Sequence, residues 1–192
     1  ALDGKHFFYV NPLEVHPKSL KFNHIYDHVK PVRQRWFGCA CCPPNIARLL
    51  TSLGHYIYTP REEALYINLY VGNQVEIPVG EKTLRLRISG DYPWREQVKI
   101  VIESPSTVNH TLALRLPDWC EGPHITLNGA PVTQDIRQGY LHIHHLWQEG
   151  DTLMLTLPMP VRRVYGNPLV RHQAGQVALQ RGPLVYCLEQ RS

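Results

Sequence analysis

A two-residue alternation of apolar with other side chains recurs after residue 60, and it constrains the fold more than any other feature of the chain. Successive side chains of a β-strand point to opposite faces, so this period is typical of a strand with one buried face. The alternation predicts half-buried strands in five segments. They are Leu65-Ile67-Leu69-Val71, Leu84-Leu86-Ile88, Val98-Ile100-Ile102, Leu112-Leu114-Leu116 and Leu153-Leu155-Leu157.

The segments between these strands favour an antiparallel arrangement. Asn128-Gly129 separates two apolar runs, and this pair is preferred in tight hairpins because both central residues need positive φ. Short strands spaced by about ten residues, with turn residues and no helix between them, are typical of a β-sandwich. We therefore predict a mainly β fold, an antiparallel β-sandwich. Two further strands are predicted around Val177–Leu179 and Leu184–Leu188, as the beginning of another domain.

A helical period precedes the alternation. Five apolar residues recur there at spacings of three and four, which places them on one face of a helix. They are Ile46, Leu49, Leu50, Leu53 and Ile57. Pro43 and Pro44 open this helix, since proline is tolerated where the first amide protons have no partner. The period changes near Tyr58-Thr-Pro60, and we place a domain boundary there.

Composition excludes several classes of protein. Of the 192 residues, 43% are hydrophobic, which is enough for a real core, and the formal charge of +4 is spread along the chain, which argues against nucleic acid binding. No apolar stretch is long enough to span a membrane. The five cysteines are odd in number and irregularly spaced, so a reducing cytoplasm is expected rather than a disulfide scaffold, with Cys120 and Cys187 as buried structural thiols.

Two adjacent cysteines carry the strongest chemical signal. Cys41 and Cys42 lie immediately before the helix, where unpaired amides and the helix dipole stabilise a thiolate. A thiolate serves both as a nucleophile and as a metal ligand. A zinc site would need further ligands, and nothing later in the chain provides a second pair. A cysteine-rich turn packed against the helix stays open as an alternative, while a disulfide between adjacent cysteines would be strained.

Other polar residues have ordinary explanations beside functional ones. His142 and His144 would share one face of a strand and could bind a metal, but polar positions on a solvent-facing side explain them equally well. Tyr9 could offer its hydroxyl to a sugar or to a thiolate, although packed tyrosines with an exposed tip are common. Glu14 could act as a general acid or base, or lie exposed in a loop.

The segment Cys39-Ala-Cys-Cys-Pro-Pro-Asn45, followed by Ile-Ala-Arg48, resembles the zinc-binding cysteine motif of glycoside hydrolase family 127, the β-L-arabinofuranosidases. Support comes from Phe8-Tyr-Val-Asn-Pro-Leu13, Leu116-Pro-Asp-Trp-Cys120 and the segment 177–189, so the resemblance spans nearly the whole chain. It implies three parts. Residues 1–58 would be the end of a catalytic (α/α)6 barrel, 59–162 a β-sandwich domain, and 163–192 the start of a second, truncated β-sandwich domain.

The resemblance also implies a bacterial enzyme that hydrolyses β-L-arabinofuranosides or related glycans with retention, through a zinc-held cysteine nucleophile. Cys41 then corresponds to the nucleophile and a zinc ligand, Cys42 to a second zinc ligand, and Tyr9 to a tyrosine that binds the sugar. The family's other zinc ligands and its acid/base glutamate lie upstream, and no Glu-x-Cys occurs between Ala1 and Gly38. We therefore expect the amino-terminal barrel portion of the same protein as a partner, and no hydrolysis by this chain alone.

Two interpretations from other functional classes stay open. In a non-catalytic carbohydrate-binding or structural β-sandwich, exposed aromatics such as Trp94, Trp119 or Trp147 would matter. In a zinc-dependent interaction module, loss of the metal would abolish folding or partner binding. The expected ligand is a carbohydrate rather than a nucleic acid or a membrane, and the formation of a homo-oligomer stays open.

Overall fold

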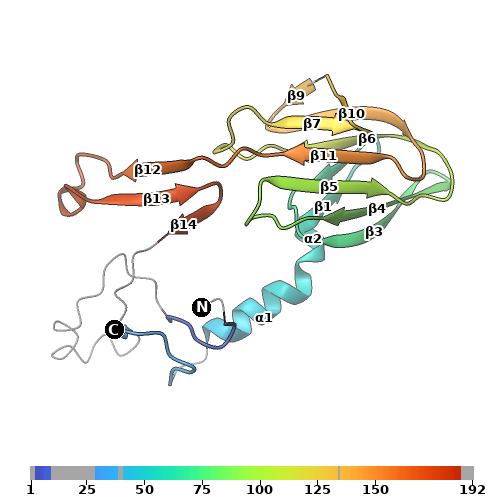
Figure 1. The fold of residues 1–192 in the computed structure, drawn as a ribbon. Coiled ribbons are helices and arrows are strands. Elements are labelled where there is room, and N and C mark those ends of the chain that lie inside the picture. Colours follow the sequence, from blue (N-terminus) through green and yellow to red (C-terminus); the bar gives the residue numbers. More distant parts are fainter. Residues whose placement is uncertain (1–2, 10–28, 39–40, 134, 187–192) are drawn as a thin grey trace. The chain divides into compact units, whose positions relative to one another are not determined.

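The computed structural model describes residues 3–9, 29–38, 41–133 and 135–186 (Figure 1). The chain divides into two compact units, Ala1–Leu53 and Gly54–Ser192, which are described separately. The second unit consists mainly of antiparallel strands, as the alternation predicts. In the part of the chain that the structure describes, no helix is both long and apolar enough to cross a membrane.

The first unit contains the predicted helix, α1 (Cys42–Ser52), with the two prolines in its first turn. Its apolar stripe is exposed, because none of the helix residues is buried among the residues described. Ile46, Leu49 and Leu50 are 59%, 49% and 63% exposed. The amphipathic period therefore identifies the helix, but the predicted helix is too long, because Ile57 lies in a separate short helix. The described residues do not cover the apolar face of α1.

The second unit begins with the short helix α2 (Gly54–Ile57) and continues as two sheets that enclose one core. The first sheet consists, in spatial order, of β1 (Tyr58–Pro60), β2 (Ala64–Ile67), β6 (Val108–Arg115), β10 (Tyr140–Trp147) and β9 (Asp135–Arg137). The second consists of β3 (Asn73–Val79), β4 (Lys82–Ser89), β5 (Gln97–Ile102), β11 (Thr152–Thr156), β7 (His124–Leu127) and β8 (Ala130–Pro131).

The apolar positions of the alternation form the core between these sheets. At Leu84, Leu86 and Ile88 of β4, the exposed fraction is 2% or less, and the same holds for the predicted positions within β5, β6 and β11. Leu116, predicted as the last core position of the β6 segment, lies beyond the end of that strand and is only partly buried. The predicted hairpin is confirmed, since Asn128 and Gly129 have φ of 51° and 83° between β7 and β8. The alternation thus predicts both the strands and the side of each strand that is buried.

The first predicted strand is corrected in two respects. β2 ends at Ile67 instead of continuing to Val71, because Tyr70 turns into the core and its hydroxyl donates to the Arg115 carbonyl oxygen at 2.6 Å. β2 also pairs parallel with β6, with Leu65 opposite Leu112, whereas all other strand pairs described are antiparallel. Period alone does not distinguish the direction of a neighbouring strand.

Three further predicted residues either need correction or lie outside the described residues. Cys120 lies in a turn after β6 and is only partly buried, although it packs against the core and burial raises the pKa of its thiol. Cys187 lies outside the described residues. Trp147 is fully buried, and its indole nitrogen donates to the His110 carbonyl oxygen at 2.9 Å, so it belongs to the core and cannot contact a ligand.

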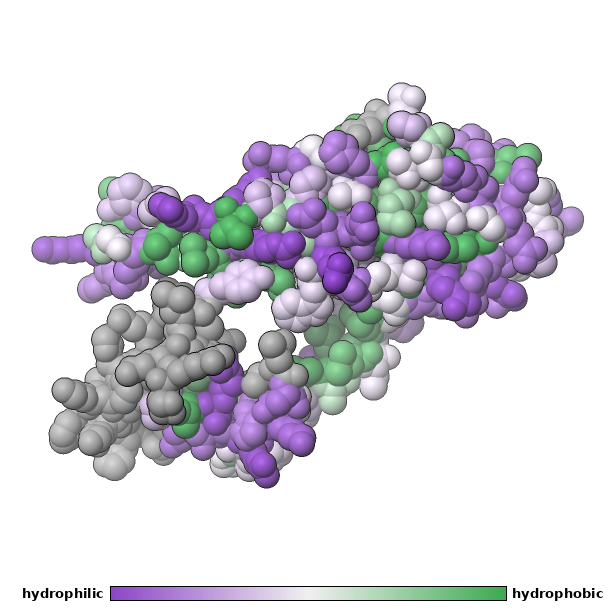
Figure 2. All heavy atoms as spheres, viewed as in Figure 1, coloured by the Kyte–Doolittle hydropathy of each residue, from purple (hydrophilic) through white to green (hydrophobic). Residues whose placement is uncertain are grey.

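A third sheet follows the sandwich. It consists of β12 (Val161–Tyr165), β13 (Val177–Arg181) and β14 (Leu184–Tyr186), with a 3₁₀ turn, η3 (Arg171–Gln173), after β12. Many of its apolar side chains are exposed, and Figure 2 shows hydrophobic residues at its surface. Glu96 joins this sheet to the sandwich, because one carboxylate oxygen accepts from the Met159 amide at 2.8 Å and lies 3.8 Å from Arg181.

Candidate active site

Tyr9 is positioned by backbone pairing and by an aromatic cluster in the first unit. Phe7 and Gln34 exchange two backbone hydrogen bonds, with N···O distances of 2.9 and 3.0 Å. The buried ring of Phe37 packs between the rings of Phe7 and Tyr9, at centroid distances of 5.2 and 5.3 Å. Tilted aromatic pairs at this separation are favourable, so the cluster holds Tyr9 by packing rather than by its hydroxyl.

Cys41 is the residue that precedes the first turn of α1. Residues of the motif that follows it hold the Cys41 backbone by hydrogen bonds. The side-chain amide of Asn45 donates to the Cys41 carbonyl oxygen at 2.9 Å. Arg48 in turn donates to the side-chain oxygen of Asn45 at 3.1 Å. Asn45 and Arg48 thus fix Cys41 through neighbouring positions on one helix face.

The hydroxyl of Tyr9 contacts the sulfur of Cys41, although the two residues are 32 positions apart in the sequence. The structure therefore brings together two of the three predicted site residues. Cys41 is exposed and Cys42 is partly exposed, and both are free thiols, so the disulfide alternative is not formed. Cys39 and Glu14 lie outside the described residues.

The donor set around Cys41 fits zinc only in part. Thiolates are soft ligands that zinc favours, and a zinc ion in a protein usually has four ligands. Within the described ranges, no group of three or more His, Cys, Asp or Glu side chains could hold a metal ion. Cys41 and Cys42 could therefore contribute at most two ligands, and the others would have to come from elsewhere.

The sequence did not predict the supporting roles of three residues in this arrangement. Phe37 supports Tyr9, while Asn45 and Arg48 support Cys41. The helix spacing of Cys41, Asn45 and Arg48, four and three residues apart, was the signal that could have revealed the second pair. The role of Phe37 had no such signal, because its contact with Tyr9 joins segments that are distant in the sequence.

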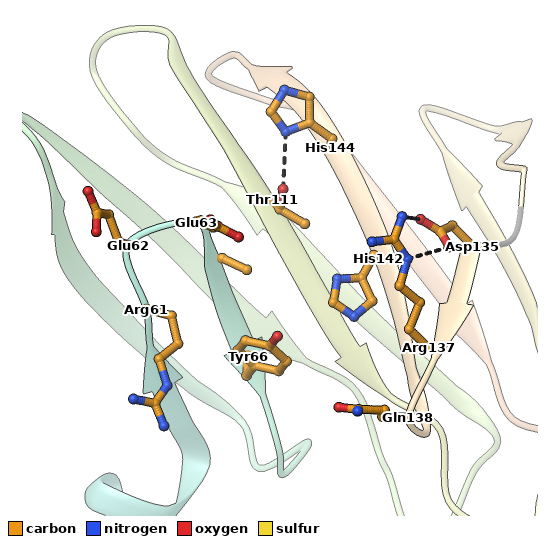
Figure 3. A pocket seen from close by; sticks show the side chains of 11 residues that line it. Arg61, Glu62, Glu63, Tyr66, Thr111, Asp135, Arg137, Gln138, His142 and His144 are labelled. Carbon is orange, nitrogen blue, oxygen red and sulfur yellow. Dashed lines mark hydrogen bonds and ion pairs between the residues drawn. The ribbon is translucent and has the colours of Figure 1, made fainter.

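The histidine cluster divides between the two faces of β10. His142 and His144 lie on the outer face and line one hollow, as predicted from their spacing (Figure 3). His144 Nδ1 lies 3.1 Å from the Thr111 hydroxyl. His145 is on the opposite face, where its ring packs on Trp147 at 5.0 Å and lies 3.5 Å from an Asp151 oxygen. The described residues thus provide no third ligand for a metal beside His142 and His144.

Sequence profiles define the class of protein to which this fold and site belong. The profile described as "Beta-L-arabinofuranosidase, GH127 catalytic domain" matches residues 1–55. The profile of the GH127 middle domain matches residues 64–159, and that of the family 127 C-terminal domain matches residues 161–192. The class is therefore that of multidomain glycoside hydrolases, and the matched domains follow one another along this chain.

The chain belongs to glycoside hydrolase family 127. It is 39% identical over 198 residues to the non-reducing end β-L-arabinofuranosidase of Bifidobacterium longum subsp. longum, covering 99% of this chain and 29% of that protein. The crystal structure of Ara127N, a GH127 β-L-arabinofuranosidase from Geobacillus stearothermophilus T6, is 50% identical with a TM-score of 0.85, covering 97% of this chain and 30% of that one.

Another solved structure, the GH127 β-arabinofuranosidase BT3674, is 34% identical with a TM-score of 0.79 and covers 96% of this chain and 30% of that one. The chain thus spans about 30% of the length of these relatives. The mainly β fold that the alternation predicted is the fold of the matched segments of these two solved structures. The resemblance that the cysteine motif indicated is confirmed.

Proposed function

We propose that this chain is the segment of a retaining glycosidase that supplies the cysteine nucleophile and the β-sandwich domains, acting on β-L-arabinofuranosides or related glycans. The observation that carries the proposal is the contact between the Tyr9 hydroxyl and the Cys41 sulfur at the start of α1. A thiol at a helix N-terminus is favoured as the thiolate, which is the nucleophilic form. The names of the relatives support the choice of sugar.

In the proposed reaction, the Cys41 thiolate attacks the anomeric carbon and forms a carbon–sulfur bond. The bond from this carbon to the leaving oxygen breaks, and a carboxylic acid gives that oxygen a proton. Water then attacks the same carbon, the carbon–sulfur bond breaks, and the carboxylate takes the proton of the water. Two successive displacements retain the configuration at the anomeric carbon. The acid/base carboxylate is expected upstream of this chain.

Tyr9 and Asn45 have supporting roles in this proposal. A hydrogen bond from the Tyr9 hydroxyl would stabilise the Cys41 thiolate and leave the tyrosine beside the bound sugar. Asn45 would hold the Cys41 backbone so that the sulfur keeps its direction during attack and release. The Cys41 and Cys42 sulfurs would bind zinc, whose positive charge supplies further stabilisation of the thiolate.

The proposed division of the chain follows from these roles. Residues 1–58 would belong to the catalytic barrel, 59–162 to the first sandwich and 163–192 to the second. The exposed apolar stripe of α1 supports the first assignment, since a barrel helix packs against neighbouring helices on such a stripe. Because the acid/base group and the other zinc ligands would lie upstream, hydrolysis requires a longer protein than this chain.

The test uses a chimera in which this chain replaces the matching segment of the Geobacillus relative. Zinc content and hydrolysis of an aryl β-L-arabinofuranoside are measured in the chimera, in the chain alone, and in both with Cys41→Ala and Cys42→Ala together. We expect about one zinc per chimera, hydrolysis by the chimera only, and loss of both properties in the double variant.

The chimera with Cys120→Ala serves as the matched control, because Cys120 is a free, partly buried thiol on the sandwich. This variant should keep both zinc and hydrolysis. If the Cys41 and Cys42 double variant still hydrolyses the substrate at the original rate, Cys41 is not the nucleophile. If the chimera folds but binds no zinc, the metal part of the proposal is wrong.

A further inference from the structure

A polar hollow on the outer face of the first sheet has no part in the proposed reaction. It has a volume of about 770 Å³ and lies over β2, β6, β10 and β9 (Figure 3). A second hollow of about 280 Å³ shares Arg61, Tyr66 and Gln138 with it and continues to Tyr140 and Asn68. The shared residues make the two hollows neighbours, so together they form one groove, which we call the outer-face groove.

The strand register explains why the sheet is hollow here. On the outer face, Ala113 of β6 stands between Tyr66 of β2 and His142 of β10. One step along the strands, Thr111 stands in the same way between Ala64 and His144. The small side chain of Ala113 between two larger ones, and the pair of Ala64 and Thr111 beside His144, leave a trough. Ala113 is fully buried despite its place on the outer face, because its neighbours' side chains overhang it.

The aromatic wall of the groove is held in place by ring contacts. The Tyr66 ring packs edge-to-face on Tyr140 at 5.1 Å and on His142 at 5.8 Å. The Tyr140 hydroxyl donates to the Asn68 side-chain oxygen at 2.8 Å, which fixes the second ring. Figure 3 shows Tyr66 between Arg61 and His142. Preorganised aromatic rings offer apolar contact area at a low cost in conformational entropy.

The polar groups around this wall include several with no partner among the described residues. The side chains of Arg61, Glu63 and Gln138 line the groove and make no hydrogen bond or ion pair in the described part of the chain. By contrast, Arg137 beside them is paired with Asp135 by two hydrogen bonds of 2.9 and 2.6 Å. A guanidinium, a carboxylate and an amide therefore converge on the hollow with their donors and acceptors available.

The chemistry of this lining selects one class of ligand. Carboxylates and guanidinium groups occur side by side, so the groove has no dominant charge of the kind that binds a polyanion. Carboxylate, amide and guanidinium groups pair well with neighbouring hydroxyls, and a tyrosine ring packs against the C–H face of a sugar. The length of the groove, across two hollows, suits several linked units better than one.

We propose that the outer-face groove is a saccharide-binding site that holds a neutral oligosaccharide chain of the substrate glycan. Tyr66 would stack on one sugar unit, and Arg61, Glu63 and Gln138 would bind hydroxyls of that unit and its neighbours. The site would keep the enzyme on a polymeric glycan between cleavages. This inference rests on the proposed function for the choice of arabinose and for the cleavages between which the site would hold the glycan, but not for the binding itself.

The test measures binding, not hydrolysis, by isothermal titration calorimetry on the 192-residue chain. Arabinotetraose is the probe, with L-arabinose and heparin as comparators. We expect arabinotetraose to bind at least about tenfold more tightly than L-arabinose, because the longer ligand fills both hollows, and heparin not to bind. Tyr66→Ala and Glu63→Ala should each weaken arabinotetraose binding, by about tenfold for Tyr66→Ala.

Trp94→Ala is the control, since Trp94 is an exposed aromatic that does not line the groove. It should leave binding unchanged. Glu63 is exposed, so Glu63→Ala tests the site even if Tyr66→Ala destabilises the sandwich. The proposal is overturned if arabinotetraose does not bind, if heparin binds instead, or if both groove variants bind like the unaltered chain. Loss of binding in the chimera would also overturn it, because another part of the enzyme would then cover the groove.

This experiment separates the inference from the proposed function. Binding by the chain together with an inactive chimera would support the groove and count against the cysteine mechanism. An active chimera with no binding by the chain would do the reverse.

Discussion

At the scale of single residues, the beginning of α1 concentrates the groups on which the proposed chemistry depends. Cys41 has its sulfur against the Tyr9 hydroxyl and its carbonyl oxygen held by Asn45. Neither contact is made by Cys42, and this difference is consistent with different roles for the two thiols. Replacement of single atoms in this group should therefore change reactivity while leaving the fold intact.

Tyr9→Phe removes only the hydroxyl that contacts Cys41 and keeps the ring that packs on Phe37. Loss of a hydrogen bond to a charged group costs about 1.5–3 kcal/mol, so we expect kcat/KM of the chimera to fall about ten- to hundredfold. Steady-state kinetics with the aryl arabinofuranoside measure this. Tyr56→Phe removes an exposed tyrosine hydroxyl and should have no effect. Equal losses in both variants would show that the Tyr9 contact is irrelevant to the reaction.

His110 gives the sandwich a pH dependence. Its ring is buried in β6, and burial, with a smaller contribution from His144, lowers its pKa below the ordinary 6.5. As pH falls below about 6.5, the unfolded chain takes up a proton that the folded chain does not, so the free energy of unfolding should decrease and then level off below the folded pKa.

Urea unfolding of the chain at pH 8, 6.5 and 5 measures this dependence. His110→Gln, which cannot titrate, should reduce the loss of stability between pH 8 and pH 5. A pH profile of the same steepness in both proteins would mean that other groups cause it.

At the scale of secondary-structure elements, the two faces of β10 differ in what they contribute to stability. Leu141 is 1% exposed and faces the core, whereas Leu146 is 48% exposed. Leu141→Ala should cost about 2–5 kcal/mol of unfolding free energy, because it leaves a cavity between the sheets. Leu146→Ala should change the free energy of unfolding by no more than about 0.5 kcal/mol. Denaturant unfolding measures both, and similar losses would contradict the assignment of faces.

The join between the sandwich and the third sheet depends on Glu96. Its carboxylate accepts from the Met159 amide at 2.8 Å and lies near Arg181, which also donates to the Trp94 carbonyl oxygen at 3.1 Å. Glu96→Ala leaves that amide without its acceptor, so we expect a loss of about 1 kcal/mol. Glu76→Ala breaks an exposed pair with Arg85 and should cost less. Thermal unfolding compares the two, and the opposite order would refute this role.

At the scale of the whole molecule, the sequence predicted most of the fold and only part of the site. The alternation located β4, β5, β6 and β11 because a strand with one buried face imposes that period on its side chains. It did not predict the parallel pairing of β2 with β6, which depends on how the chain crosses between strands rather than on side-chain period. The side-chain period therefore predicts where the strands are, but not which strands pair or in which direction.

The same limit applies to the two proposed binding regions. Cys41 and Cys42 were predicted because local motifs carry their own chemistry. Tyr9 was predicted as a hydroxyl that could reach a sugar or a thiolate, and the resemblance implied the first of these roles. The outer-face groove was not predicted, since it arises where Tyr66, Ala113 and His142 meet across three strands that are distant in the sequence. Side chains that become neighbours only when separate strands pair leave no signal in any single stretch of the sequence.

The central claim is that Cys41 is the nucleophile, and the most direct test is to identify the residue that becomes covalently attached to the sugar. The chimera is mixed with an aryl β-L-arabinofuranoside, quenched in acid within one turnover, and digested for peptide mass spectrometry. The account predicts one pentosyl adduct on Cys41, absent in Cys41→Ala. An adduct on another residue, or turnover with no adduct and an inverted product by NMR, would contradict it.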